Sequence, residues 1–236
     1  MKQYIQNFKK SQPLLEELVA RDIKIKYRRS VLGVLWTLLN PLLMMIVLSV
    51  VFSNLFKFDV ENFPLFILSG QVIFNFFSES TTNAMGAILG NASLIRKIYV
   101  PKYLFVISRI FSSFINLMAS FTALLLVMVV TRAELHWTVI LVPIPLVLLV
   151  AFSMGIGLIL SAIAVKFRDI MHLYSVFVTA LMYLTPVIYP MSILPESVRT
   201  VVNINPLTNM VQMFRDVMFY NTLPTFSAVV LGVVEV

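Results

Sequence analysis

The chain of 236 residues contains no cysteine, so it has neither disulfides nor a zinc site built on thiolates. Its only two histidines, His136 and His172, each lack a second histidine at ligand spacing, which argues against a metal site. Charged residues make up 12% of the chain, whereas soluble domains carry about 25%. Together with 59% hydrophobic residues, this shortage of charge excludes an ordinary soluble domain.

A nucleotide-binding loop is also missing. The sequence has no G-x-x-x-x-G-K-[ST] motif and no Gly-Lys pair at all. The chain therefore cannot cradle nucleotide phosphates in such a loop. Transport powered by ATP would need a separate ATPase polypeptide.

What the chain does contain is a series of long apolar runs, and about 20 helical residues span a ~30 Å hydrocarbon core. We therefore expect an all-α polytopic membrane protein, with one domain over residues 1–236 and six transmembrane helices. Pro41 and Pro186 are expected to kink the first and fifth spans. A sixth run begins near Leu223 and is too short to cross, so we expect a truncated last helix, with an end at the membrane interface as the alternative. The five full spans are predicted near 31–55, 64–89, 103–130, 138–165 and 171–189.

Lysine and arginine are unevenly divided between the two sides of these spans. Of the 18 basic residues, fourteen fall on the side of the N-terminus and four on the other side. Because basic residues accumulate in cytoplasmic loops, the N-terminus is predicted to be cytoplasmic. The net charge of +7 then reflects topology and anionic lipid headgroups, and no nucleic-acid partner is expected.

The basic segment before the first span, residues 11–29, is predicted to form a helix lying along the membrane surface. Ser11 is expected to cap this helix, and Pro13 to occupy its first turn. The alternative, a basic flank that only anchors the first span, stays open. Apolar residues at helical spacing form one face and basic residues the other: Leu14, Leu18 and Ile25 against Arg21, Lys24 and Arg28.

The cytoplasmic connection NASLIRKIYVPK is longer than a simple turn needs. It predicts a short helix over 91–100, capped by Asn91, that presents a mixed face to a cytoplasmic partner. A basic loop without a partner is an equal alternative. The face would consist of Leu94, Ile95, Arg96, Lys97 and Ile98.

The outside segment 195–220 contains two pieces that each open on a proline. Neither piece is long enough to span, so both are predicted to be amphipathic helices dipping into the outer leaflet. In the second piece Asn205 is expected to be the cap. Its apolar stripe comprises Leu207, Met210, Val211, Phe214, Val217 and Met218.

Glu79 is the one acidic residue well inside a predicted span. A charge near mid-membrane costs roughly 3 kcal/mol, so such residues usually face a polar interior or a partner. We therefore expect a channel lined by Glu79 and Asn75, unless Glu79 is hydrated at the boundary. Aromatic rings in such a channel could stack on sugars, with core or lipid contact as the competing interpretation: Phe74, Phe77, Tyr174 and Phe177.

These segments together resemble the membrane subunit of the polysaccharide-exporting ABC transporters, the permeases for O-antigen, capsule and teichoic-acid polymers. The resemblance covers nearly the whole chain in the right order, and it departs at the incomplete C-terminal helix. The matching strings are RDIKIKYRRSVLGVLWTLLNP, FPLFILSGQVIFNFF, NASLIRKIYVP, KFRD, YLTPVIYP and NPLTNMVQMFRD.

The resemblance implies a homodimer of six-helix subunits in the cytoplasmic (inner) membrane, bound to two ATPase subunits. ATP and magnesium would be held by those partners, with no cofactor on this chain. Residues 11–29 would be the interfacial helix, 91–100 the coupling helix that docks on the ATPase, and 195–220 the gate helices over a channel.

The implied substrate is a polysaccharide linked to a polyprenyl diphosphate lipid. Basic residues near the cytoplasmic mouth are candidates for binding the diphosphate through charge-assisted hydrogen bonds. These candidates are Arg28, Arg29, Arg96 and Lys97. In the gate helices, the residues implied to form the gate are Pro206, Met210, Phe214 and Arg215.

Other classes of protein compete less well. A lipid or drug efflux permease of the same wider family would share the architecture. A membrane enzyme acting on prenyl-linked sugars would need clustered acids, whereas Asp22 and Asp169 lie far apart in sequence. An ion-driven flippase would need about twice as many helices in one chain.

Overall fold

The computed structural model describes residues 2–28, 32–33, 35–56, 60, 62–97, 99–224 and 226–235. Within these residues every regular element is a helix, which confirms the predicted all-α fold. The elements are α1 (Lys2–Tyr27), α2 (Leu35–Phe56), α3 (Phe63–Met85), α4 (Ala87–Gly90), α5 (Ala92–Ile95), α6 (Tyr103–Thr131), η1 (Trp137–Leu141), α7 (Pro143–Lys166), α8 (Ile170–Leu184), η2 (Met191–Ile193), α9 (Glu196–Ile204), α10 (Pro206–Met218) and α11 (Phe226–Glu235).

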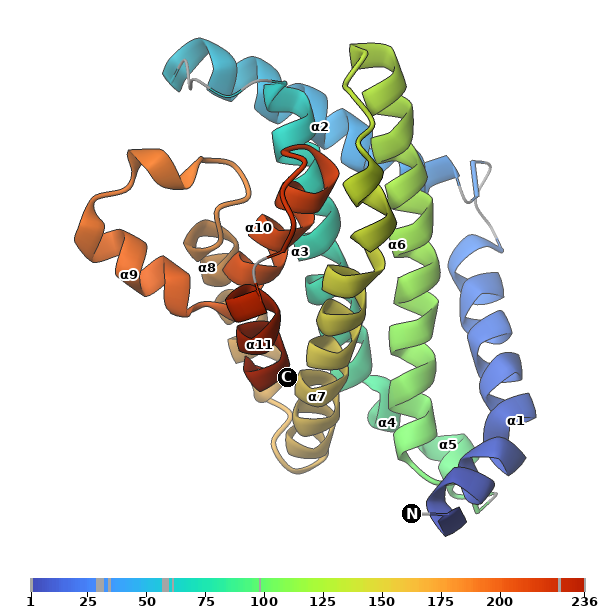
Figure 1. Cartoon of the computed structure of the whole chain (residues 1–236). Helices are drawn as coiled ribbons and strands as arrows, with labels where there is room; N and C mark the ends of the chain where they lie inside the picture. Colours follow the sequence, from blue (N-terminus) through green and yellow to red (C-terminus); the bar gives the residue numbers. More distant parts are fainter. Residues whose placement is uncertain are drawn as a thin grey trace.

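Three long helices, α3, α6 and α7, pack side by side at the centre of the bundle (Figure 1). Helix α10 packs against α3 and α7, α1 runs alongside α6, and α2 contacts both α3 and α6. Large side chains from several of these helices are fully buried between them, among them Phe105, Leu149 and Phe214. One continuous apolar core therefore joins the central helices and α10.

The helices differ in whether they are long and apolar enough to cross a membrane. By length and composition, three helical segments of the described chain can cross a membrane: Leu35–Ser53, Tyr103–Thr131 and Trp137–Lys166. Helix α3 has 23 residues, but it carries many polar side chains, and α8 has only 15. The membrane character of the fold agrees with the prediction, whereas the count of six spans stays a prediction.

Proline ends one of these helices instead of kinking it. Thr185, which precedes Pro186, has the extended backbone angles φ −101° and ψ 134°. A residue before proline is sterically disfavoured in the helical region, so α8 ends at Leu184 and not near residue 189. Helix α2, in contrast, continues through Pro41.

Helix α1 differs in two ways from the predicted surface helix. It begins at Lys2, well before Ser11, so Ser11 does not cap it and Pro13 lies inside it. It also lies alongside α6 (Figure 1), and its last residue, Tyr27, bonds to Asn116 near the middle of that helix. This arrangement is not that of a helix lying flat across the end of the bundle.

The two outer helices form as predicted, and the apolar face of α10 packs inside the chain. The Asn205 side chain accepts a hydrogen bond from the Leu207 backbone N–H at 3.1 Å, which confirms the predicted cap of α10. The apolar stripe of α10 is buried against α3 and α7 within the same subunit. The hydrophobic period of α10 was therefore predicted correctly, whereas the dipping of both helices into the outer leaflet stays a prediction.

Candidate functional site

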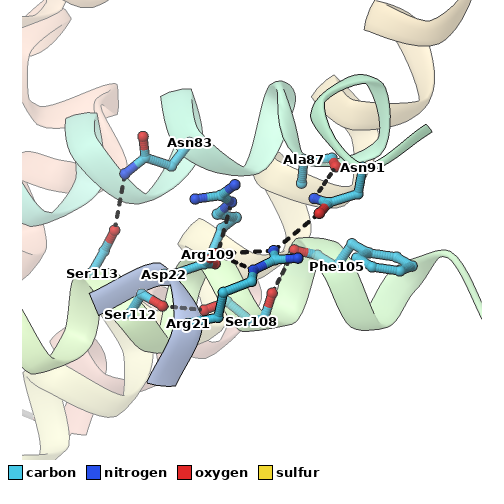
Figure 2. Close-up of polar contacts among 10 residues, drawn as sticks. All are labelled: Arg21, Asp22, Asn83, Ala87, Asn91, Phe105, Ser108, Arg109, Ser112 and Ser113. Carbon is cyan, nitrogen blue, oxygen red and sulfur yellow. Dashed lines mark hydrogen bonds and ion pairs between the residues drawn. The ribbon is translucent and has the colours of Figure 1, made fainter. Parts of the chain in front are cut away.

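A buried polar cluster joins α1 to α6 and to the connection between α4 and α5 (Figure 2). The Asp22 carboxylate, whose side chain is 2% exposed, forms ion pairs with Arg21 at 3.0 Å and Arg109 at 3.3 Å. Arg21 also donates to the Asn91 side-chain oxygen at 3.0 Å, and Asn91 donates to the Ala87 carbonyl. One carboxylate thus fixes three parts of the chain together.

The burial of Asp22 makes this cluster hard to open. Removing one partner from a buried ion pair costs about 3–5 kcal/mol, because the remaining charge loses its compensation. Sequence reasoning considered Asp22 only as a possible catalytic acid and missed this role. The available signal was its position, because Leu15, Leu18 and Asp22 are spaced as one helix face. They are the buried residues within positions 11–27 of α1.

A second polar cluster lies one turn further along α1. Lys26 Nζ donates to Glu79 Oε1 at 2.7 Å, and Asn116 Nδ2 donates to the same oxygen at 2.8 Å. The Tyr27 hydroxyl donates to the Asn116 side-chain oxygen at 2.8 Å. Because the Lys26 and Glu79 side chains are 44% and 33% exposed, their pair contributes only about 0–1 kcal/mol. This contact can therefore open while the Asp22 cluster stays closed.

Two cavities meet at the Lys26–Glu79 pair. A cavity of about 310 Å³ lies on the side of Asp22 and Arg109. A groove of about 530 Å³ lies on the other side, and we call it the α3 groove. Its polar lining consists of Lys26, Tyr27, Thr37, Asn40, Gln71, Asn75, Ser78, Glu79, Asn116 and Ser120.

The α3 groove contains only part of the predicted channel lining. Glu79 and Asn75 line this groove, and their role in a channel stays a prediction. Phe74 and Phe77 are 4% and 3% exposed, and Phe77 stacks on Phe152 with ring centroids 5.6 Å apart. These two rings belong to the core, because the helix face that carries them packs inside the subunit.

The two predicted channel residues of α8 also have different surroundings. Tyr174 is buried and its hydroxyl donates to Thr81 Oγ1 at 2.7 Å, so it packs against α3 instead of lining a conduit. Phe177 is 54% exposed and does not line the α3 groove. Core packing was the competing interpretation of these aromatic residues, and the structure favours it for Tyr174.

The predicted coupling helix is shorter than expected. Helix α5 spans Ala92–Ile95, a single turn, instead of 91–100. The Asn91 side chain makes no capping bond, because it is engaged with Arg21 and with α4. Of the predicted docking residues, Leu94 and Ile95 are half-buried, Arg96 and Lys97 are exposed, and Ile98 lies outside the described residues.

The four candidate diphosphate residues do not form one cluster in the described structure. Arg28 is exposed just beyond the end of α1, and Arg29 lies outside the described residues. Arg96 and Lys97 follow α5, on the far side of the Asp22 cluster. The cation that reaches the α3 groove beside Glu79 is Lys26, which sequence reasoning did not single out.

Toward the other end of α3, Arg215 of α10 is almost fully buried. Its guanidinium donates to the Phe66, Pro186 and Val187 carbonyls at 2.9, 2.7 and 3.2 Å and to the Ser69 hydroxyl at 3.2 Å. It also lies 3.5 Å from the centre of the Phe66 ring, a favourable cation–π contact. Arg215 therefore ties α10 to α3 and to the turn after α8.

The residues predicted to form an outside gate share this buried environment. Met210 and Phe214 are fully buried and Arg215 is 4% exposed, while Pro206 is half-buried at the start of α10. Because these side chains fill the interior of one subunit, they do not line an aperture in this conformation. In the described part of the chain, no three histidine or acidic side chains cluster as metal ligands.

Comparison with known proteins assigns the family. The model of the ABC-2 type transporter family matches residues 13–219, from α1 through α10. This chain belongs to the ABC-2 type transporter family. The match covers both polar clusters of this ABC-2 transporter chain, the α3 groove and the Arg215 site.

Individual relatives of this ABC-2 chain carry similar names. It is 32% identical over 213 residues to the O-antigen export system permease protein RfbA of Myxococcus xanthus, covering 89% of this chain and 82% of that protein. It is 27% identical to the RfbA protein of Klebsiella pneumoniae, with the same coverage. It is 24% identical to the polysialic acid transport protein KpsM of Escherichia coli, covering 86% of this chain and 80% of KpsM.

Proposed function

We propose that this chain is the permease subunit of an ATP-driven exporter that moves a polysaccharide across the cytoplasmic membrane. The observation that carries the proposal is similarity over 89% of the chain to proteins named O-antigen export permeases. The subunit is multi-pass, has its N-terminus in the cytoplasm and performs no covalent chemistry.

The substrate in this proposal is a polymer linked to a polyprenyl diphosphate lipid. The α3 groove supports such a substrate, because its amide and hydroxyl side chains can both donate to and accept from sugar hydroxyls. Asn40, Gln71 and Asn75 bring amides from two helices to the groove. An apolar drug would gain little from so many polar partners.

The proposed assembly is a homodimer with two cytoplasmic ATPase subunits, which bind ATP and magnesium. The exposed residues Arg96 and Lys97, directly after α5, are the proposed docking point. Asn91 at the start of this segment bonds to Arg21 of α1. Movement of the docked segment would therefore act on α1 as well as on α6.

Deletion of the gene in the strain that carries it tests the proposed function. We expect surface polysaccharide to be lost while lipid-linked polymer accumulates on the cytoplasmic side of the membrane. Reintroducing the gene should reverse both effects. Unchanged surface polysaccharide in the deletion strain would contradict the proposal, and accumulation of an unglycosylated lipid would favour lipid efflux instead.

Reversing the charge of the docking point should separate the permease from its ATPase. The double substitution Arg96→Glu and Lys97→Glu should lower co-purification of the ATPase about tenfold or more, because like charges placed at an interface cost several kcal/mol. Arg132→Glu is the control, because Arg132 is exposed at the other end of α6. Equal recovery of the ATPase with all variants would rule out this docking point.

A further inference from the structure

Two hydrogen-bond donors converge on one oxygen at the boundary between the two cavities. Lys26 Nζ and Asn116 Nδ2 lie 2.7 and 2.8 Å from Glu79 Oε1. An ammonium group and an amide N–H that meet at one anionic oxygen would serve a phosphate oxygen equally well. The site is thus built for an anion, and the carboxylate of Glu79 occupies it.

The helix that carries Lys26 and the side chain of Asn116 are held in place independently of Glu79. Lys26 lies one helical turn after Asp22, whose buried ion pair with Arg109 fixes α1 against α6. The Asn116 side chain is oriented by the Tyr27 hydroxyl, which donates to its oxygen at 2.8 Å. Displacing Glu79 would therefore leave both donors close to where they are.

The site can be reached by a ligand. The Lys26 and Glu79 side chains are 44% and 33% exposed, and both line the 310 Å³ cavity and the 530 Å³ groove. A group passing from one cavity to the other would meet this pair. The cavity on the α1 side is also lined by Arg109, whose charge is balanced by its ion pair with Asp22.

We infer that Lys26 and Asn116 form a binding site for the diphosphate group of the lipid-linked substrate, and that Glu79 occupies this site when it is empty. The ligand class rests on the proposed function. The incoming diphosphate takes the two donors, and the Glu79 carboxylate is released from them. A diphosphate competes well with a single carboxylate, because it carries more negative charge and more acceptor oxygens.

Binding of inorganic pyrophosphate to the purified full-length permease in nanodiscs of a neutral phospholipid tests the site. Glu79→Gln removes the competing charge and should tighten binding about fivefold, the equivalent of one exposed ion pair. Lys26→Gln removes the charged donor and should weaken binding about tenfold. The control is Lys24→Gln, an equal loss of charge on the exposed side of α1, outside the groove.

Each result of these binding measurements either supports or overturns the inference. Weaker or unchanged binding in Glu79→Gln, or equal losses in Lys26→Gln and Lys24→Gln, would overturn the inference. Thermal unfolding of each variant is measured alongside, and Glu79→Gln keeps the inference testable if Lys26→Gln is unstable. No polymer or ATP is present, so the binding site can fail while the export function holds, and the reverse.

Membrane lipids are another source of phosphate. The same titration is therefore repeated in nanodiscs that contain phosphatidylglycerol, whose headgroup is a phosphodiester. Pyrophosphate binding that persists with the same order of variants supports a diphosphate site. Loss of pyrophosphate binding in these discs would mean that headgroups fill the site, and would overturn the assignment.

Discussion

Asp22 and Lys26 lie one turn apart on the same helix and form ion pairs of very different strength. Asp22 is buried between two arginines, whereas the pair of Lys26 with Glu79 is partly exposed. A buried pair resists opening because each separated charge would be left uncompensated in a desolvated environment, while water screens an exposed pair. The ion pairs of Asp22 are therefore suited to holding α1 against α6, and the Lys26–Glu79 pair is one that a ligand can break.

The substitution Asp22→Ala should destabilise the protein by about 2–4 kcal/mol, because Arg109 and Arg21 lose a buried partner. The value lies below the full cost of a buried pair, because the arginine side chains are 32% and 36% exposed and regain some hydration. Thermal unfolding of the purified variants measures the effect. Glu17→Ala, at an exposed position of α1, is the control.

Equal stability of Asp22→Ala and Glu17→Ala would show that Asp22 does not fix α1. That result would also weaken the inference about Lys26, because the position of Lys26 depends on the contact of Asp22 with Arg109.

Among the elements, α10 shows most clearly how a helix can be predicted and its surroundings missed. Its cap, its proline start and its apolar stripe are all visible in the sequence, and each is confirmed. The turn after α8 and the first two turns of α3 close around its Arg215 side chain. Three sequence-distant segments therefore meet at one guanidinium, and close approach of their backbones is required there.

Gly70 of α3 is the position where this close approach can be tested. A Cβ at Gly70 would lie 2.7 Å from Arg215 Nη2 and 3.0 Å from Val187 Cα. Since the second contact is with backbone, Gly70→Ala should force the elements apart and cost about 1–3 kcal/mol. Thermal unfolding in detergent measures this cost.

The matched control is Gly155→Ala, within α7. A Cβ at Gly155 would meet nothing within 4 Å, so this change should be neutral or stabilising by up to about 1 kcal/mol, because alanine favours a helix over glycine. If Gly70→Ala behaved like Gly155→Ala, the junction around Arg215 would be looser than the structure indicates.

For the whole molecule, the central question is which end of the bundle faces the cytoplasm. The distribution of basic residues predicts that the end carrying α5 is inside and the end carrying the α6–η1 connection is outside. Exposed apolar side chains on α6 and α7, such as Val129, Val147 and Ile159, are suited to contact with lipid. The two ends can be distinguished chemically, because the chain contains no cysteine of its own.

Single cysteines at exposed positions test this orientation. Ser93→Cys, in α5, should react with a membrane-impermeant maleimide only after the cells are permeabilised. Glu134→Cys, between α6 and η1, should react in intact spheroplasts. The reverse pattern would place the N-terminus outside and would invalidate the proposed docking point for the ATPase.

Much of the molecule was predictable from the sequence alone, because helix formation in a membrane depends on local properties. The length of the apolar runs, the scarcity of charge and the period of the stripes sufficed for the all-α class and for most helix positions. Local hydrogen bonding also fixed details such as the cap at Asn205. Pro186 ended α8 instead of bending it, because Thr185 before the proline adopts extended backbone angles.

Only the tertiary structure decided which surface covers each helix face. A hydrophobic period identifies the buried side of α10, but it cannot distinguish lipid from the subunit's own core. Likewise, Lys26 and Glu79 are 53 residues apart, and Tyr27 and Asn116 are 89 apart, so no local pattern links them. Their pairing depends on how α1 packs along α6, and that arrangement places a lysine of α1 at the boundary between the two cavities.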